Sequence, residues 1–370
     1  MSIDQSKVLD GARNLVRYAE IRAGHQVLIH VEPGNKAEPG ADDPAVIEAL
    51  RTAVTEVGAR ASVIMTPPWH KTAEPPPPIF AAALEGADFL IGQGEYLFTK
   101  NHYLQVAIFE KGLVYIENEA KTAAALSSSY GRFPAELMFA IGTAVTDKVA
   151  RARTARVTTP AGTDMRMSIR PETVGGYCYP FRQDAPGYKK GFPGGTACFH
   201  PEDPVEGVIV GEAFARFLKM PICNPPLRLV YRNHRAVEIS GGGADWLLDF
   251  WKRRGDENSS WLAECMWGVH PRAGGLGTRD ASNPHLLHFG LGNSIPYGGP
   301  TFSKTWVVLF CQDATLTLDG EPILDHGRLT VLDAPEVRAV ASRYGDPNEL
   351  LAQVPVTIQD AFGGHRHGHS

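Results

Sequence analysis

The chain has 370 residues, and 43% of them are apolar, which is enough to build ordinary hydrophobic cores and more than a single core normally fills. Its formal net charge is −5 and it contains no long basic run, so it lacks the electrostatic character of a nucleic-acid-binding protein. The 38 glycines and 28 prolines are scattered without a period, which indicates many turns and excludes a collagen-like chain.

The N-terminal stretch MSIDQSKVLDGARNLVRYAEIRAG carries charges throughout and lacks the apolar core of a signal peptide. No later stretch reaches membrane-spanning length, so we expect a cytoplasmic protein with no membrane partner. The five cysteines are widely spaced and form no CxxC pair, which favours free thiols over disulfides or structural zinc. The His-rich tail GGHRHGHS is expected to be a solvated end.

Apolar runs typical of buried strands alternate with stretches of helical periodicity in residues 1–153. This alternation predicts a doubly wound α/β domain with a mostly parallel sheet. The expected helices cover 8–22, 42–58, 98–111 and 134–153, and the expected strands cover 25–32, 61–66, 88–92 and 113–117.

The second helix has clear end signals, since Asp42 or Asp43 can cap it, Pro44 suits its first turn and Gly58 ends it. The loop before it, PGNKAEPGADDP, is not a Gly-rich phosphate loop and would repel phosphates with its acidic residues. We therefore exclude a dinucleotide site here. The EPPPPI stretch at 74–79 is expected to be an extended surface loop.

After residue 153 the pattern changes to short segments separated by Gly, Pro, Asn and Asp, which predicts a β-rich catalytic domain over 154–345. Residues 346–370 are expected to form a C-terminal extension. A cleft between the two domains is the expected place for a small-molecule site. The expected strands flank the turn in RVTTPAGTDMRMSIR and include TACFH, GVIV, LRLVYR, RAVEIS, WVVLF and ATLTL.

Five ordered stretches of the second half carry a family resemblance. They are TTPAGTDMRMSI (158–169), FPGGTACFHPEDPVEGVIV (192–210), AECMWGVHPRAGGLG (263–277), HFGLGNSIPYGG (288–299) and LDGEPILDHGRL (318–329). Together they resemble the superfamily of aminopeptidase T-like metallopeptidases, and more closely its branch containing 2,5-dihydroxypyridine 5,6-dioxygenase, an iron enzyme that opens an aromatic ring. The resemblance implies a homo-oligomeric enzyme with a metal site.

Most of the metal-ligand positions that the resemblance implies are substituted. The peptidase pattern would place acidic ligands at Thr196 and Glu264, a histidine at His288 and a His-x-Asp pair at Thr305 and Val307. The dioxygenase pattern would place a histidine at position 264 and the same pair. Threonine and valine cannot replace an imidazole and a carboxylate as ligands, so the resemblance implies a site that is degenerate or relocated.

Three residues of these stretches are candidates for the catalytic centre. Glu264 lies between apolar neighbours in WLAECMWG, where a carboxylate is unfavourable unless it is paired, hydrogen-bonded or functional. His288 begins HFGLG, whose glycines allow a close backbone approach, and His270 precedes a proline on an expected loop. If a metal is retained, these three could form a two-histidine, one-carboxylate face for Fe(II) or Zn(II). The structural alternatives are a buried ion pair and ordinary core or surface histidines.

Candidate substrate-binding residues come from three places. Thr196, Cys198 and His200 share one face of the expected strand TACFH. The spacing of about 6.5 to 7 Å between Cys198 and His200 exceeds direct hydrogen bonding, which favours a lining role over a thiol nucleophile with its base. Tyr297 in IPYGG is a candidate donor to a substrate oxygen, and Trp267 is a candidate for an aromatic wall, with a turn and core packing as alternatives.

His102 lies near the start of the third expected helix. The resemblance to the dioxygenase branch implies a histidine within one residue of this position, so His102 is a candidate general base. The leading hypothesis is a catabolic enzyme that opens or hydrolyses a small aromatic or heterocyclic substrate in the interdomain cleft. Glu264 and His102 would move protons, and His288 and His270 would orient substrate or a displaced metal.

Four other functions stay open on the sequence. They are an Fe(II)-dependent ring-cleaving dioxygenase, a metal-free hydrolase in which His102 or His288 activates water beside backbone oxyanion donors, a metal-dependent aminopeptidase, and a non-catalytic binding or structural homologue. A degenerate metal site motivates the last of these.

Overall fold

The computed structural model describes residues 3–34, 40–69, 75–93, 102–174, 189–215, 222–274, 280–295 and 299–363. The chain divides into two compact units. The first contains the residues up to Phe139 together with strand β7 (Lys189–Phe192), and the second contains nearly all of the rest from Ala140 onward. The chain therefore returns to the first unit after it has begun the second, and residues 346–363 cluster with the second unit.

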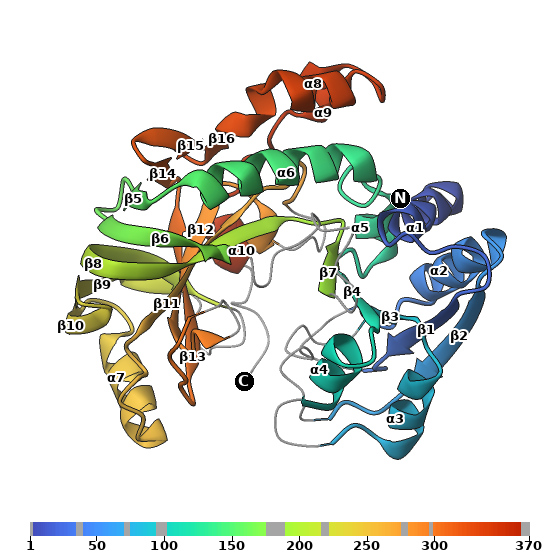
Figure 1. Cartoon of the computed structure of the whole chain (residues 1–370), viewed down its shortest axis with the longest axis horizontal. Coiled ribbons are helices and arrows are strands. Elements are labelled where there is room, and N and C mark those ends of the chain that lie inside the picture. The colour runs from blue at the N-terminus through green and yellow to red at the C-terminus, as the bar shows by residue number, and fades with distance from the viewer. Residues whose placement is uncertain are drawn as a thin grey trace. The chain divides into compact units, whose positions relative to one another are not determined.

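The first unit is a five-stranded, fully parallel sheet in the order β2-β1-β3-β4-β7 (Figure 1). Helices α3 and α4 pack on the face that carries Leu28, Leu90 and Tyr115, while α1, α2 and α5 pack together on the other face. The doubly wound α/β prediction is confirmed. The strands are β1 (Gln26–Val31), β2 (Arg60–Met65), β3 (Phe89–Gly92) and β4 (Val114–Asn118), and the helices are α1 (Gln5–Tyr18), α2 (Pro44–Glu56), α3 (Pro78–Glu85), α4 (His102–Phe109) and α5 (Ala123–Ser127).

The ends of α2 form as the sequence predicts. The Asp43 carboxylate accepts a hydrogen bond from the Ala45 N–H at 3.0 Å, Pro44 occupies the first turn, and Gly58 adopts a left-handed φ of 78° just after the helix. One expectation needs correction, because helix α3 begins at Pro78 inside the stretch that was expected to be extended. Proline suits this first helical position, where its missing N–H has no intrahelical partner.

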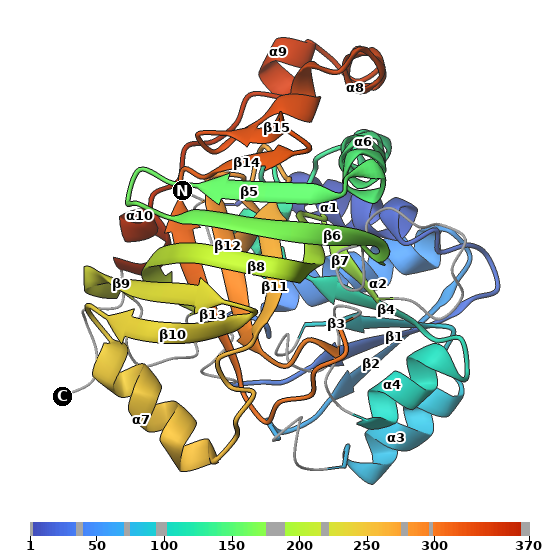
Figure 2. The same cartoon turned by 60° about the vertical axis from the view of Figure 1, so that its left-hand side comes forward.

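The second unit is built on an eleven-stranded sheet in the order β11-β12-β13-β8-β6-β5-β14-β15-β16, with β9 on β8 and β10 on β9 (Figure 2). Strand β11 also pairs with the start of β8, so that β8, β11, β12 and β13 form a closed circuit of antiparallel pairs. The strands are β5 (Thr154–Thr158), β6 (Asp164–Val174), β8 (Thr196–Phe214), β9 (Ile222–Arg232), β10 (Arg235–Ser240), β11 (Leu262–Gly268), β12 (Leu286–Gly292), β13 (Trp306–Gln312), β14 (Thr315–Leu318), β15 (Glu321–Asp325) and β16 (Arg328–Leu329).

Helices accompany this sheet, and the β-rich prediction is confirmed. They are α6 (Ala135–Arg151), α7 (Ala244–Arg254), α8 (Pro335–Ala341), α9 (Pro347–Leu350), α10 (Ile358–Phe362) and the 3-10 turns η2 (Asp280–Ser282) and η4 (Thr330–Asp333). One detail differs from expectation. TACFH and GVIV belong to the single strand β8, because the residues between them continue to pair with β6. The glycine-rich LLHFGLG, which carried no secondary-structure prediction, is strand β12.

Four cysteines are buried free thiols, as the spacing predicts, and Cys178 lies outside the described residues. Within the described residues, no helix has the length and apolar character needed to cross a membrane. The cytoplasmic location and the homo-oligomeric state stay predictions.

Candidate functional site

One face of strands β8, β11, β12 and β13 brings several of the candidate residues together. Residues directly opposite each other in antiparallel strands point to the same side of a sheet. Met266 lies opposite both Cys198 and His288, and Glu264 lies opposite Gly290. Phe310 lies opposite His288, and Thr196 lies opposite Gly268. We call this surface the dyad face, and it carries Thr196, Cys198, Glu264, Met266, His288 and Phe310.

Glu264 and His288 form the chemical centre of the dyad face. The Glu264 side chain is fully buried and the His288 side chain is 4% exposed, and Oε1 of the first lies 4.0 Å from Nε2 of the second. A carboxylate is costly to bury, and a neighbouring imidazole that can become protonated offsets that cost. The ring of Phe310 lies 4.8 Å from the imidazole ring, centroid to centroid, and provides an apolar wall.

Gly290 makes the space that the Glu264 carboxylate occupies. A Cβ atom at position 290 would lie 2.4 Å from Glu264 Oε1 and 2.7 Å from its Cδ, both shorter than real contacts of such an atom. Glycine is therefore required opposite Glu264 for steric reasons. The HFGLG motif serves the site through this glycine as well as through its histidine.

His200 is the last of the three candidates on β8, after Thr196 and Cys198, and a backbone carbonyl fixes its ring. Its Nδ1 lies 2.7 Å from the carbonyl oxygen of Ala263, so this nitrogen carries the proton and donates. Burial lowers the pKa of His200 below its ordinary value, which keeps the ring neutral near pH 7. The ring stacks on His234 at 5.9 Å, and that ring stacks in turn on Trp261 at 4.3 Å.

His270 has a structural position in the loop that follows β11. Its backbone N–H donates to Ser282, and its Nδ1 accepts a hydrogen bond from the Arg272 N–H at 3.1 Å. Burial lowers the pKa of His270 to about 3, so the ring is neutral at all physiological pH values. No group of three His, Cys, Asp or Glu residues that could hold a metal ion occurs in the described part of the chain. The expected metal face of Glu264, His270 and His288 is therefore not assembled there.

The positions that the resemblance assigned to a His-x-Asp pair also fail as ligands. Val307 lies opposite Leu291 and therefore points away from the dyad face, while Trp306 and Val308 occupy the corresponding places on it. The Thr305 hydroxyl lies 3.0 Å from that of Ser303. None of these side chains offers an imidazole or a carboxylate, so the iron site implied by the resemblance does not fit the described residues.

Among the remaining candidates, Trp267 is described by the structure and does not lie on the dyad face. Trp267 is fully buried on the opposite face, where its ring lies 6.1 Å from that of Phe199, because it is an odd number of residues from Glu264 along a strand. Trp267 therefore does not share a face with Glu264 and His288, and its expected contact with substrate stays a prediction. His102 begins α4 in the first unit, and its side chain lies outside the described part of the chain, as does the whole of Tyr297.

Sequence analysis missed the apolar residues that surround the pair. Met266, Trp306 and Phe310 pack around Cys198 and His288. The signal that could have found them is strand alternation, which places every second residue of WLAECMWG and WVVLF on one side.

The parallel α/β unit and the large antiparallel unit together form an aminopeptidase T-like fold. AmpT from Thermus thermophilus has this fold, with a TM-score of 0.60 at 14% identity over 88% of this chain and 99% of that chain. A structure of 2,5-dihydroxypyridine dioxygenase from Pseudomonas putida KT2440 matches with a TM-score of 0.70 at 17% identity, over 91% of this chain and 99% of that one.

The family model of 2,5-dihydroxypyridine 5,6-dioxygenase (NicX) matches residues 7–331, and the chain belongs to that family. A comparison with curated proteins finds no match. The family and the structural neighbours together point to an enzyme.

Proposed function

We propose that the protein is a ring-opening enzyme for small hydroxylated aromatic or N-heterocyclic compounds, with Glu264 and His288 as its proton-transfer pair. Family membership supports the substrate class. The observation that carries the assignment of residues is the buried contact of 4.0 Å between Glu264 Oε1 and His288 Nε2.

The pair suits the proton chemistry that opening a hydroxylated ring requires. Removing the proton of a ring hydroxyl makes the ring electron-rich and prepares it for attack. Because His288 turns Nε2 toward Glu264, its Nδ1 is the atom that would receive this proton. The Glu264 carboxylate would then stabilise the imidazolium, and the 4.0 Å contact would tighten in the substrate complex.

The surroundings of the pair favour both the electrostatics and a planar substrate. Met266 and Phe310 flank His288 on the dyad face, and both are nearly inaccessible to water. Charges interact more strongly among apolar groups than in water, so an imidazolium formed at His288 during the reaction would be attracted more strongly to the Glu264 carboxylate. An aromatic side chain and a thioether also pack well against a flat ring.

Metal chemistry enters this proposal only through the family. A bound Fe(II) would supply oxygen activation, but the described residues do not provide its ligands, so no step here depends on it.

The source of the oxygen in the product is assigned by running the reaction in ¹⁸O₂ and, separately, in H₂¹⁸O. Label from ¹⁸O₂ identifies an oxygenase, and label from water alone identifies a hydrolase.

The test is consumption of ring compounds by the purified chain, beginning with 2,5-dihydroxypyridine and monitoring loss of ring absorbance. We expect Glu264→Gln to lower kcat by about 10²- to 10⁴-fold, the range of a lost proton-transfer group. Glu212→Gln is the matched control, because Glu212 is a partly buried carboxylate on β8 that is held by the Gln312 N–H. Full activity of Glu264→Gln would exclude the pair, and cleavage of dipeptides without ring opening would identify a peptidase instead.

A further inference from the structure

The second unit contains a polar pocket that the proposed function does not use. Its volume is about 420 Å³, and its walls come from β16, η4, α8, α9 and the residue just before β12. Two arginines, a histidine and one aspartate are among the residues that line it. The polar residues that matter below are His285, Arg328, Asp333, Arg338, Asn348 and Gln353.

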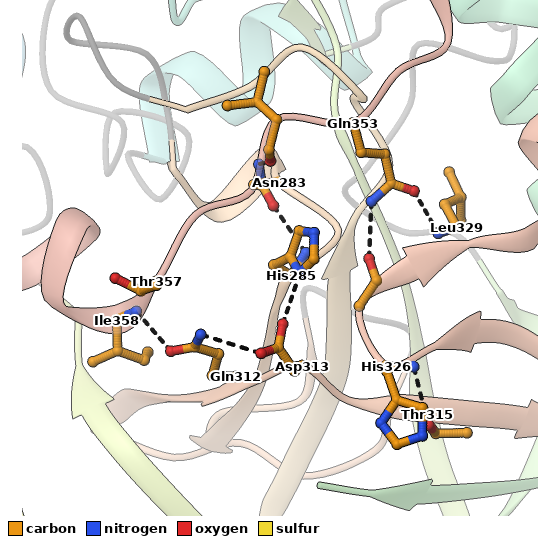
Figure 3. A network of polar contacts seen from close by, with 12 residues as sticks. Asn283, His285, Gln312, Asp313, Thr315, His326, Leu329, Gln353, Thr357 and Ile358 are labelled. Carbon is orange, nitrogen blue, oxygen red and sulfur yellow. Dashed lines mark hydrogen bonds and ion pairs between the residues drawn. The ribbon is translucent and has the colours of Figure 1, made fainter. Parts of the chain in front are cut away.

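His285 is held in this wall by a carboxylate (Figure 3). Its Nδ1 lies 2.6 Å from Oδ1 of Asp313, and Oδ2 of the same carboxylate accepts a hydrogen bond from Gln312 Nε2 at 3.2 Å. The Asp313 backbone has a left-handed φ of 50°, a conformation that non-glycine residues rarely adopt. The contact fixes the orientation of the ring, and no hydrogen bond from the described residues uses its Nε2.

The turn between β15 and β16 packs directly on this His–Asp pair. A Cβ atom at Gly327 would lie 2.5 Å from His285 Nδ1 and 3.0 Å from Asp313 Oδ1, so only glycine fits. The Gln353 side chain fastens the same turn, because its Nε2 donates to the Gly327 carbonyl at 3.0 Å and its Oε1 accepts from the Leu329 N–H at 2.7 Å (Figure 3). The wall of the pocket is thus fixed before any ligand binds, which reduces the ordering cost of binding.

The charges around the pocket favour an anion. Asp333 is the acidic residue among those that line the pocket, and Arg328 neutralises its charge by forming an ion pair with it. Arg338 donates from Nη2 to Asn348 Oδ1 at 2.8 Å, and its Nε and Nη1 donate to no group in the described residues. A guanidinium oriented in this way presents a fork of donors that matches a carboxylate or a phosphate.

We propose that this pocket binds a small oxyanion, the carboxylate or phosphate group of a metabolite, through Arg338 and through Nε2 of protonated His285. Asp313 compensates the charge that His285 acquires and keeps Nε2 directed at the ligand. This site is independent of the ring-opening proposal, because it shares no residue with the dyad face.

The experiment is a calorimetric titration of the full chain with inorganic phosphate and, separately, with malonate. We expect saturable binding of at least one of them, which identifies the preferred oxyanion. Arg338→Gln should weaken it at least about tenfold, the loss expected for a charge-assisted contact. Arg253→Gln is the matched control, because it removes the same charge from an exposed ion pair with Asp249 on α7.

A pair of variants at His285 separates ligand binding from folding. The amide nitrogen of His285→Asn replaces Nδ1 and keeps the bond to Asp313 while removing Nε2, so we expect a normal Tm and weaker binding. The amide of His285→Gln reaches the place of Nε2, so it should bind more tightly than His285→Asn. Three results would overturn the proposal: no saturable binding of either ion, equal losses in Arg338→Gln and Arg253→Gln, or wild-type binding by His285→Asn.

Discussion

Replacing Gly290 by alanine tests whether the Glu264 carboxylate lies where the structure places it. The new Cβ atom would lie 2.4 Å from Oε1, 2.5 Å from Cγ and 2.7 Å from Cδ of Glu264. The backbone at Gly290 has no left-handed conformation, so the whole effect of the substitution is steric. Glu264 is fully buried and cannot move into solvent to relieve the contact.

The expected magnitude follows from these contacts. Inserting one carbon into a well-packed interior typically costs about 1–3 kcal/mol, and the three short contacts place Gly290→Ala in the upper part of that range. The carboxylate must also move away from His288, and misplacing a catalytic group by about 1 Å lowers rates by about 10²-fold. Stability and ring-opening activity should therefore fall together.

Urea unfolding and the ring-absorbance assay measure the two effects. Gly86→Ala is the control, because Gly86 lies at the end of α3 with a φ of −100°, and a Cβ atom added there would meet no heavy atom within 4 Å. If Gly290→Ala unfolds at the wild-type urea concentration and keeps wild-type activity, the carboxylate does not occupy this space and the argument fails.

Three further predictions concern other parts of the chain. The free energy of unfolding of the wild type should fall by up to about 1.4 kcal/mol per pH unit as the pH falls from 6.5 to about 3, because His270 binds a proton in the unfolded state but stays neutral when buried in the folded state. In urea unfolding, His270→Asn should remove this part of the pH dependence. Burial raises the pKa of Cys265 well above its ordinary value and that of Cys311 to about 12, so peptide mapping should find both unalkylated by iodoacetamide until the protein unfolds. Asp43→Ala should lower the free energy of unfolding by about 1–2 kcal/mol, because Asp43 caps α2 and accepts from the Ala123 N–H; an unchanged urea midpoint would contradict this.

Local signals predicted the architecture of the first unit. The spacing of apolar residues and the capping signals at Asp43, Pro44 and Gly58 are properties of neighbouring residues, so they can be recognised without tertiary contacts. Strand β7 was missed because its sequence, KKGF, has no apolar run, and its place in the sheet depends on pairing with β4. Pairing between distant segments leaves little trace in a single short stretch.

The candidate site was predictable only in part for the same reason. Glu264 and His288 were identified from their chemistry and the family resemblance, but their contact depends on the register between β11 and β12. A shift of one residue moves a side chain to the other face of a sheet, which explains why Trp267 and Val307 point away from the pair. His270 lies beyond the end of β11, where strand alternation no longer predicts its direction.

A double-mutant cycle on ring-opening kcat/KM tests the central claim most directly, with Glu264→Gln, His288→Gln and the double variant measured at one pH. Residues that move a proton as a unit lose their function together, so the account predicts that the double variant is no more than about threefold slower than the slower single variant. Losses that multiply, so that the double variant falls by the product of the two single effects, would show that Glu264 and His288 act independently and would contradict the proposed pair.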